Sequence, residues 1–388
     1  MKGWGNRRVL MTDWIKRTFE IDHTGHRTIL PMEGVRGFAV FLVFLVHYAT
    51  MVGPWLKAGS VTQAVSDGVL LIGHAGVDLF FVLSGFLIYG MLISKRRPMG
   101  RYALRRVQRI YPTFAVVFAT YLALSFVFPA ESKIPPGSNG LMYVLANALL
   151  LPGIFDIEPM ITVAWSLSYE ALCYLLIPLI MITLRLRVWL PRHRVQFFVA
   201  MALGLFVVFS LFGGPIRLTF FVCGILVYEL VQADADRRMS KWGLPAIVLA
   251  IGSTLLVPMV GLAAYWRFVL LFIFFFVFCV ACLGGRGASA RAFAYAPMRW
   301  LGNMSYSYYL IHGLALKAAF LVLGQVYPPQ TDASALFWLL LPVAFAVTLV
   351  PSAVLFLCVE KPYSLTRRSQ QQHGQDPVSP PMSVGAQG

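Results

Sequence analysis

Long uninterrupted apolar runs dominate this chain and restrict what it can fold into. The runs are about twenty residues long and are separated by short basic or Pro/Gly-rich breaks, and a helix needs about twenty apolar residues to cross a bilayer. With 59% hydrophobic and 12% charged residues, the composition is that of a polytopic membrane protein. We therefore predict an all-α fold of about ten membrane-spanning helices, at residues 35–53, 72–93, 110–129, 162–184, 195–213, 215–232, 243–260, 265–284, 303–325 and 335–359.

The formal net charge of +16 is distributed unevenly over the predicted loops. Of the 32 lysines and arginines, 26 lie in the N-terminal segment, in alternate loops and in the C-terminal tail. By the positive-inside rule both termini are predicted to be cytoplasmic. The basic excess is therefore mostly a topology signal, and no nucleic-acid partner is expected. The connections on the opposite side hold Lys57, Lys133, Arg217 and Arg267.

The predicted organisation is a cytoplasmic segment 1–34, one membrane domain 35–362 and a disordered cytoplasmic tail 363–388, whose end is rich in Gln, Ser, Pro and Gly. No cleavable signal peptide is apparent, because the first apolar run follows a long polar segment. The five cysteines fall within apolar spans and are expected to pack as small hydrophobic residues. Cys279 and Cys282 have CxxC spacing, but no second pair or ligating histidine accompanies them, so no metal site is expected.

An arginine and a histidine stand at the two ends of the stretch RGFAVFLVFLVH, with ten apolar residues between them. In a helix Arg36 and His47 lie close to three turns apart on nearly one face, which puts His47 about 16 Å along the axis, near the bilayer midplane. Glu33 is placed to pair with Arg36 one turn later. Arg36 is interpreted as a topology anchor or a site residue. His47 is interpreted as a functional group or as a structural imidazole between helices.

The second predicted span also carries ionisable groups at membrane depth. His74 and Asp78 lie one turn apart in GHAGVDLFFVLSGFLI. Ionisable residues inside a membrane are functional by default. The alternative is a small-residue packing surface with one structural His–Asp pair.

Two further spans contain polar groups that need an explanation. Glu170 lies two turns inside the fourth span, where Trp165 also fits an interfacial aromatic belt. His312 lies in the middle of the ninth span, with Tyr309 one turn before it. For His312 the alternative is simple packing of a Tyr-rich helix. For Glu170 an interfacial aromatic belt is no explanation, because a glutamate inside a span is an ionisable group in the membrane.

The connection 94–109, SKRRPMGRYALRRVQR, carries seven basic residues. Topology and contact with anionic lipid head groups explain such a cluster. The alternative is a surface for a polyphosphate ligand, because Arg106 and Arg109 are three apart on one helical face and arginine binds phosphate through two parallel hydrogen bonds.

Taken together, these motifs resemble the acyltransferase 3 family of multi-pass membrane acyltransferases. The resemblance extends from the first span to the last and rests on six stretches in the family's order: EGVRGFAVFLVFLVH (33–47), GVDLFFVLSGFLI (76–88), RRVQRIYP (105–112), WSLSYE (165–170), LGNMSYSYYLIH (301–312) and VEKP (359–362). The arginine, ten residues, histidine arrangement is the most diagnostic of them. Glu33 stands where many relatives have aspartate, and His74 lies beside a matched motif.

The resemblance implies a helical bundle around a polar cavity lined by the first, second, fourth and ninth spans. It also implies transfer of an acyl group, commonly acetyl, from cytoplasmic acyl-CoA to a hydroxyl of a cell-envelope glycan or lipid-linked sugar, in a bacterial inner membrane. Acyl-CoA is then a co-substrate, and no permanently bound cofactor is expected.

The expected roles follow from this hypothesis. His47 is the general base, with Glu33 and Arg36 on its helix. Asp78 and Glu170 orient the imidazole or bind sugar hydroxyls. The CoA phosphates are held by Arg36, Arg106 and Arg109, and the acceptor site is lined by Trp165, Glu170, Tyr309 and His312.

The competing hypothesis is a proton-coupled transporter, because buried His, Asp, Glu and Arg side chains also mark proton relays. A transporter is expected to show internal repeats with paired broken helices, whereas each motif here occurs once. A third alternative is an inactive family member that acts as a scaffold, against which the Arg36–His47 pair argues. No GxSxG elbow or convincing cysteine nucleophile is present, so direct transfer is favoured over an acyl-enzyme.

Overall fold

A computed structural model describes residues 18–21, 30–96, 98–137, 139–234, 236–329 and 333–366. Within these ranges the chain forms helices joined by turns, without a β-strand. The predicted all-α class is confirmed. The predicted cytoplasmic segment 1–34 lies mostly outside the described residues, and so does the predicted tail from residue 367 onward.

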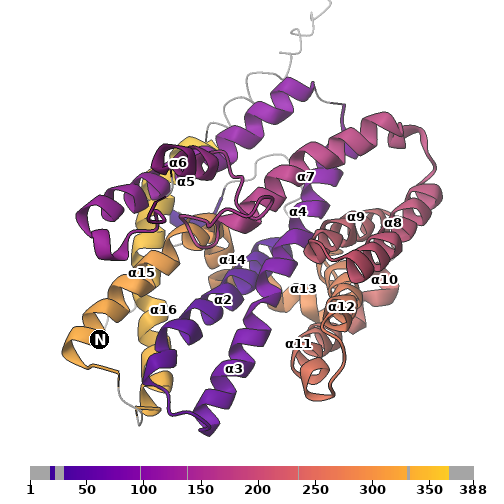
Figure 1. Ribbon diagram of the computed structural model, residues 1–388. Coiled ribbons are helices and arrows are strands. Elements are labelled where there is room, and N and C mark those ends of the chain that lie inside the picture. The colour runs from indigo at the N-terminus through magenta and orange to yellow at the C-terminus, as the bar shows by residue number, and fades with distance from the viewer. Residues whose placement is uncertain are drawn as a thin grey trace, which may run out of the picture.

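The helices follow one another along the chain in a single series (Figure 1). Their bounds are α2 (Leu30–Val52), α3 (Val61–Gly73), α4 (Ala75–Ser94), α5 (Met99–Val127), α6 (Gly140–Ala148), α7 (Ala164–Thr183), α8 (Pro191–Phe212), α9 (Thr219–Gln232), α10 (Asp236–Met239), α11 (Gly243–Met259), α12 (Tyr265–Leu283), α13 (Gly287–Phe293), α14 (Ala296–Asn303), α15 (Ser305–Val326) and α16 (Ala335–Leu355), followed by the π-helical segment η6 (Phe356–Thr366).

In the described part of the chain, nine helical stretches are long and apolar enough to cross a membrane. This is an integral, multi-pass membrane protein. The predicted span 215–232 corresponds to α9, which has only fourteen residues, most of them buried. It is short because a 3₁₀ turn, η4 (Ile216–Leu218), takes up the start of the apolar run that follows the end of α8 at Phe212.

The basic segment 94–109 differs from the sequence expectation. We predicted a connection, but from Met99 onward it is the first part of α5, a helix of 29 residues that continues past Pro112. Its arginines are therefore carried on a regular helix wall. The segment ALRRVQR consists largely of strong helix formers, which explains the extension.

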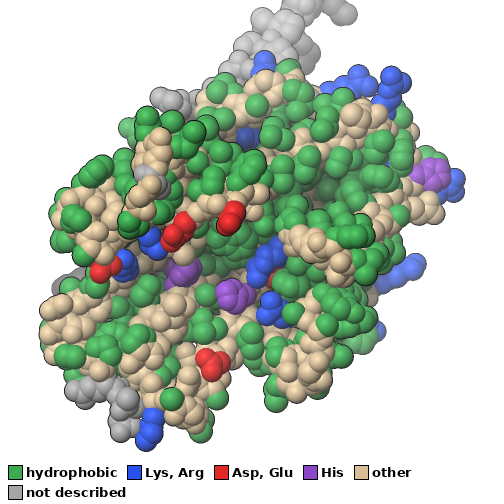
Figure 2. Space-filling view, viewed as in Figure 1, with side chains coloured by type: hydrophobic (Ala, Val, Ile, Leu, Met, Phe, Trp, Pro, Cys, Tyr) green, Lys and Arg blue, Asp and Glu red, His purple; other side chains and the backbone are tan. Residues whose placement is uncertain are grey.

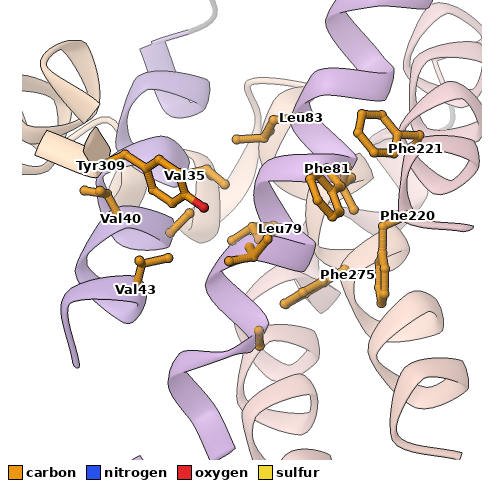
Figure 3. Close-up of a cluster of buried hydrophobic side chains, with 14 of the residues drawn as sticks. Val35, Val40, Val43, Leu79, Phe81, Leu83, Phe220, Phe221, Phe275 and Tyr309 are labelled. Atoms are coloured by element: carbon orange, nitrogen blue, oxygen red, sulfur yellow. The ribbon is translucent and has the colours of Figure 1, made fainter. Parts of the chain in front are cut away.

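Helices α2 and α4 form the centre of the bundle. Figure 1 shows α8 to α12 on one side of them and α15 and α16 on the other. The buried side chains of α4 pack between those of α2 and those of α9 and α12 (Figure 3), where Phe81 stacks on Phe221 with ring centroids 4.7 Å apart. Because lipid is as apolar as these side chains, close packing rather than water exclusion holds such helices together.

Glycines allow the closest helix contacts at this centre. A Cβ atom on Gly85 of α4 would collide with the Phe221 carbonyl of α9, and one on Gly224 of α9 would collide with the Val82 carbonyl of α4. Small residues at a helix crossing let the two backbones approach in this way. The position of α4, and of the side chains it carries, therefore depends on these glycines.

We expect Gly85→Ala to lower stability by about 1–3 kcal/mol, because the added methyl group meets backbone that cannot move aside. The measurement is the thermal unfolding midpoint in detergent. Gly204→Ala in α8 is the matched control, because a Cβ there meets nothing within 4 Å. An equal effect of the two substitutions would show that the α4–α9 crossing does not limit stability.

Candidate functional site

A cavity of about 220 Å³ lies between α2, α4, α5, α7, α15 and η6. One wall is apolar and belongs mostly to α4. The other walls are polar, and their lining groups are Arg36, Ser84, Arg105, Arg106, Gln108, Arg109, Ser166, Glu170, Tyr174, Ser305, Tyr306, Tyr309, Tyr363 and Ser364. We call the end of the bundle that carries the α5 arginines the basic end, and the opposite end, where η4 and the start of α12 lie, the distal end.

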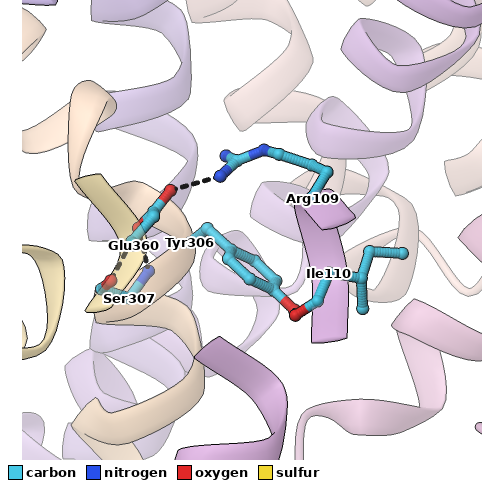
Figure 4. Close-up of polar contacts among 5 residues, drawn as sticks. All are labelled: Arg109, Ile110, Tyr306, Ser307 and Glu360. Atoms are coloured by element: carbon cyan, nitrogen blue, oxygen red, sulfur yellow. Dashed lines mark hydrogen bonds and ion pairs between the residues drawn. The ribbon is translucent and has the colours of Figure 1, made fainter. Parts of the chain in front are cut away.

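Arg109 is held by a buried carboxylate at the rim of this cavity (Figure 4). Its Nη1 donates to Glu360 Oε1 at 2.6 Å, and the side chain of Glu360 is fully buried. Glu360 Oε2 accepts hydrogen bonds from the Ser307 backbone N–H at 3.0 Å and the Ser307 hydroxyl at 2.6 Å. The Arg109 guanidinium also lies over the ring of Tyr306. The predicted Arg106–Arg109 pair therefore lines one cavity, but the charge of Arg109 is already compensated.

Arg106 is positioned by aromatic rings instead of a carboxylate. Its guanidinium lies 5.4 Å from the centroid of Tyr102 and 5.0 Å from that of Tyr174, and Nη2 is 3.0 Å from Met91 Sδ. Its buried Nε has no hydrogen-bond partner among the described residues. Arg106 thus keeps donor capacity for a ligand.

Arg36 also lines the cavity and forms no hydrogen bond or ion pair with another described residue. The expected contact between Glu33 and Arg36 is replaced by one between Glu33 Oε2 and Arg299 Nε, at 2.8 Å. The reason is packing: α14 lies so close to the first turns of α2 that a Cβ on Gly302 would collide with the Glu33 carbonyl. This contact leaves the Arg36 guanidinium to face the cavity.

Glu170 lies in the same cavity. Its Oε1 accepts hydrogen bonds from Ser84 at 3.1 Å and from Tyr174 at 2.5 Å. It therefore groups with the arginines of the basic end and not with Asp78.

His47 and His312 form a pair of imidazoles in the middle of the bundle. Their ring centroids are 4.9 Å apart with an interplanar angle of 68°. Nδ1 of the fully buried His312 is 2.9 Å from the carbonyl oxygens of both Tyr308 and Tyr309. A carbonyl only accepts, so Nδ1 is assigned the proton and Nε2 the lone pair. That Nε2 has no partner among the described residues.

Tyr309 separates this imidazole pair from the cavity. Its ring lines the cavity and lies 6.3 Å from the ring of His312. Its hydroxyl is 2.6 Å from Ser166 Oγ and donates to the Val163 carbonyl at 3.1 Å. His47 and His312 are not among the lining residues. The cavity therefore ends at a tyrosine wall, and the histidines lie behind it.

Asp78 belongs to the distal end of the bundle. Its buried carboxylate accepts a hydrogen bond from Arg217 Nη1 at 3.0 Å, and it lies in the first turn of α4, where the helix dipole favours a negative charge. The Arg217 guanidinium lies 5.6 Å from the ring centroid of Trp165. The structure thus places Asp78 beside Arg217, apart from Glu170, which lines the cavity.

Comparison with known proteins shows the family to which this chain belongs. Residues 30–357 match the acyltransferase domain family known as acyltransferase 3. The chain belongs to the acyltransferase 3 family. The O-acetyltransferase OatA of Staphylococcus aureus is 26% identical over 338 residues, covering 77% of this chain and 53% of OatA. Acyltransferase MdmB of Streptomyces mycarofaciens is 26% identical over 393 residues, covering 90% of this chain and 95% of MdmB.

The chain therefore spans about half the length of OatA and nearly all of MdmB. No solved structure matches it. The acyltransferase 3 assignment inferred from the sequence motifs is confirmed by the family match.

Sequence reasoning missed several residues of this acyltransferase domain. Glu360 stands in the VEKP stretch that was recognised, but nothing in its local sequence indicates that it holds Arg109. Arg299 was counted only as a loop charge. Arg217 carried a usable signal, because an arginine on the less basic side runs against the charge bias of the loops.

Proposed function

We propose that this protein is a membrane O-acyltransferase that moves an acyl group, acetyl being the expected one, from acyl-CoA to a hydroxyl of a cell-envelope glycan or lipid-linked sugar. The observation that carries the proposal is a cavity lined by four arginines at one end and closed at the other by Tyr309, behind which the His47–His312 pair lies. The reaction needs a site for the phosphates of its donor and a base near its thioester. The arginines provide the first, and the imidazole pair behind Tyr309 provides the second.

The donor is assigned to the basic end, which we place on the cytoplasmic side of a bacterial inner membrane. Arg36 and Arg105 have no protein partner among the described residues, and Arg106 has spare donors, so these three can grip the CoA phosphates. Arg109 lies next to these three arginines, but its charge is already compensated by Glu360. The apolar wall formed by α4 suits the pantetheine arm.

His47 is the proposed general base. As the acceptor hydroxyl attacks the thioester carbonyl, a C–O bond forms, the C–S bond breaks and the hydroxyl proton passes to His47. That proton then neutralises the departing CoA thiolate. His312 is a positioning residue in this scheme, because its Nδ1–H is bound by two carbonyls and its Nε2 is left to accept a hydrogen bond from the His47 ring. The thioester has to pass the Tyr309 ring to reach this pair.

We expect Arg36→Gln to raise KM for acyl-CoA about 10- to 100-fold with a smaller change in kcat, because a charge-assisted hydrogen bond is worth about 1.5–3 kcal/mol. Arg101→Gln is the matched control, since Arg101 is exposed on the same helix end as the cavity arginines but does not line the cavity. Initial rates over a range of acetyl-CoA concentrations provide the comparison. Equal KM values in the two variants would remove Arg36 from the donor site.

The function itself is tested with purified protein in liposomes, supplied with acetyl-CoA and envelope extract. Release of the free CoA thiol, together with recovery of the acetyl group as a base-labile ester, is the expected result. A transporter would leave the thioester intact while moving solute across the liposome. Intact acetyl-CoA under these conditions would reject the acyltransferase proposal.

A further inference from the structure

Two arginines come together at the distal end, where the predicted connections otherwise carry few basic residues. Arg217 lies in η4 and Arg267 in the first turn of α12, which are far apart in the chain. Both guanidiniums contact the same ring, that of Phe268, at 5.5 Å and 4.9 Å from its centroid. Basic residues are scarce on this side by the positive-inside bias, so a pair of them calls for a local reason.

These two cations share one buried carboxylate. Asp78 is hydrogen-bonded to Arg217, whereas Arg267 forms no hydrogen bond or ion pair with any described residue. Arg267 lies close enough to both Arg217 and Asp78 for their charges to interact. The cluster therefore keeps one positive charge in excess in a partly buried place, where an uncompensated charge is costly. An anionic ligand would remove that cost.

Aromatic side chains and an exposed imidazole flank the excess charge. Trp165 lies beside Arg217, and Tyr169 is in edge contact with Trp165 at a centroid distance of 5.7 Å. His74 is exposed, and its carbonyl accepts a hydrogen bond from Arg217. Figure 2 shows basic and histidine side chains gathered along a hollow on this face. Flat, amphipathic rings next to a cation suit a ligand with both a polar rim and an apolar face, as a sugar has.

This cluster adjoins the imidazole pair on the side away from the CoA cavity. A Cβ on Gly73 would meet Val46 and the Leu42 carbonyl, so the end of α3, just before α4 begins, is pressed against the α2 turns next to His47. His47 and His74 are near enough for their charges to interact. A ligand anchored at the distal cluster can thus present a hydroxyl to His47 while the donor approaches from the basic end.

We infer that the distal cluster, defined as Asp78, Trp165, Arg217, Arg267 and Phe268, binds the anionic group of a saccharide, so that the acceptor is an acidic glycan. The inference rests on the proposed function for the role of the bound sugar as acceptor. The binding itself depends only on the cluster. Arg267 supplies the free charge, Arg217 is held by Asp78 beside it, and Trp165 supplies the flat wall.

The test measures binding in phosphatidylcholine nanodiscs without acyl-CoA. The probes are a fluorescent tetrasaccharide containing glucuronate and the same tetrasaccharide with its carboxylates reduced to alcohols. We expect the acidic probe to bind at least about tenfold more tightly than the reduced one. Arg267→Gln should remove most of that difference, Arg267→Lys should largely keep it, and Lys57→Gln, which removes an exposed charge on the same side, should not change it.

Equal binding of the acidic and reduced probes by wild type would overturn the inference, and so would equal effects of Arg267→Gln and Lys57→Gln. If phosphatidylglycerol nanodiscs abolish the difference between the probes, the occupant is a lipid phosphate and not a saccharide. The two proposals fail separately. Selective binding without any acyl transfer would reject the enzyme proposal and keep the anion site, whereas transfer to neutral sugars without selective binding would do the reverse.

Discussion

His47→Ala is expected to lower kcat for acyl transfer by about 10²- to 10⁴-fold, the usual contribution of a positioned general base. The rate falls because the general base is removed, and in this scheme the free Nε2 of the fully buried His312 serves to orient His47 and does not receive the hydroxyl proton. The remaining rate reflects binding of donor and acceptor in one place. The measurement is transfer from acetyl-CoA under saturating donor.

The bundle should remain folded in this variant. His47 is only partly buried, and its ring contacts that of His312 without a hydrogen bond or ion pair to any described residue, so truncation breaks no strong interaction. His193→Ala provides the control, because His193 is an exposed residue in the first turn of α8. A His47→Ala protein that is as active as His193→Ala would show that another group is the base.

Glu360→Ala should have the largest effect on stability, about 3–5 kcal/mol, because it leaves a buried charge without its partner. Three interactions are lost at once: the ion pair with Arg109 and the two hydrogen bonds from Ser307. The segment η6, which carries Glu360, is then held less firmly against α5. The thermal unfolding midpoint should fall by roughly 4–6 °C, because an unfolding entropy of about 2.1 cal/mol/K per residue corresponds to about 1.2 °C per kcal/mol for a chain of 388 residues.

Two comparisons separate this explanation from a general sensitivity to mutation. Glu158→Ala removes an exposed carboxylate and should leave the midpoint unchanged. The double variant Arg109→Met with Glu360→Ala should regain part of the loss, because the uncompensated charge is gone. If the double variant is less stable than Glu360→Ala alone, the buried ion pair is not the reason for the effect.

Much of the architecture could be predicted because a membrane-spanning helix is recognisable from its own stretch of sequence. Each apolar run has about the length that a helix needs to cross a bilayer. The spacing of Arg36 and His47 alone predicts that they share a helix face. The length of α9 was overestimated because an apolar 3₁₀ turn looks like helix in the sequence. The helical start of α5 was missed because its charge density was interpreted as a loop.

The site was harder to predict because its contacts join residues that are distant in the chain. Glu33 contacts Arg299, 266 positions away, instead of its helix neighbour Arg36. Glu360 holds Arg109 across 251 positions. Hydrophobic spacing says which face a residue occupies, but the partner on that face is decided by how the helices cross. Individual polar residues at membrane depth were therefore identifiable from the sequence, whereas their grouping into a basic-end cavity and a distal cluster was not.

The central claim is that this protein moves an acyl group from CoA to an envelope hydroxyl with His47 as the general base. The most direct measurement is the transfer of label from radiolabelled acetyl-CoA into the envelope fraction by membranes carrying wild type or His47→Ala. The account predicts label in a base-labile ester with wild type and almost none with His47→Ala. Equal labelling by the two proteins, or no ester label with wild type in a host that contains acidic and neutral envelope glycans, would contradict it.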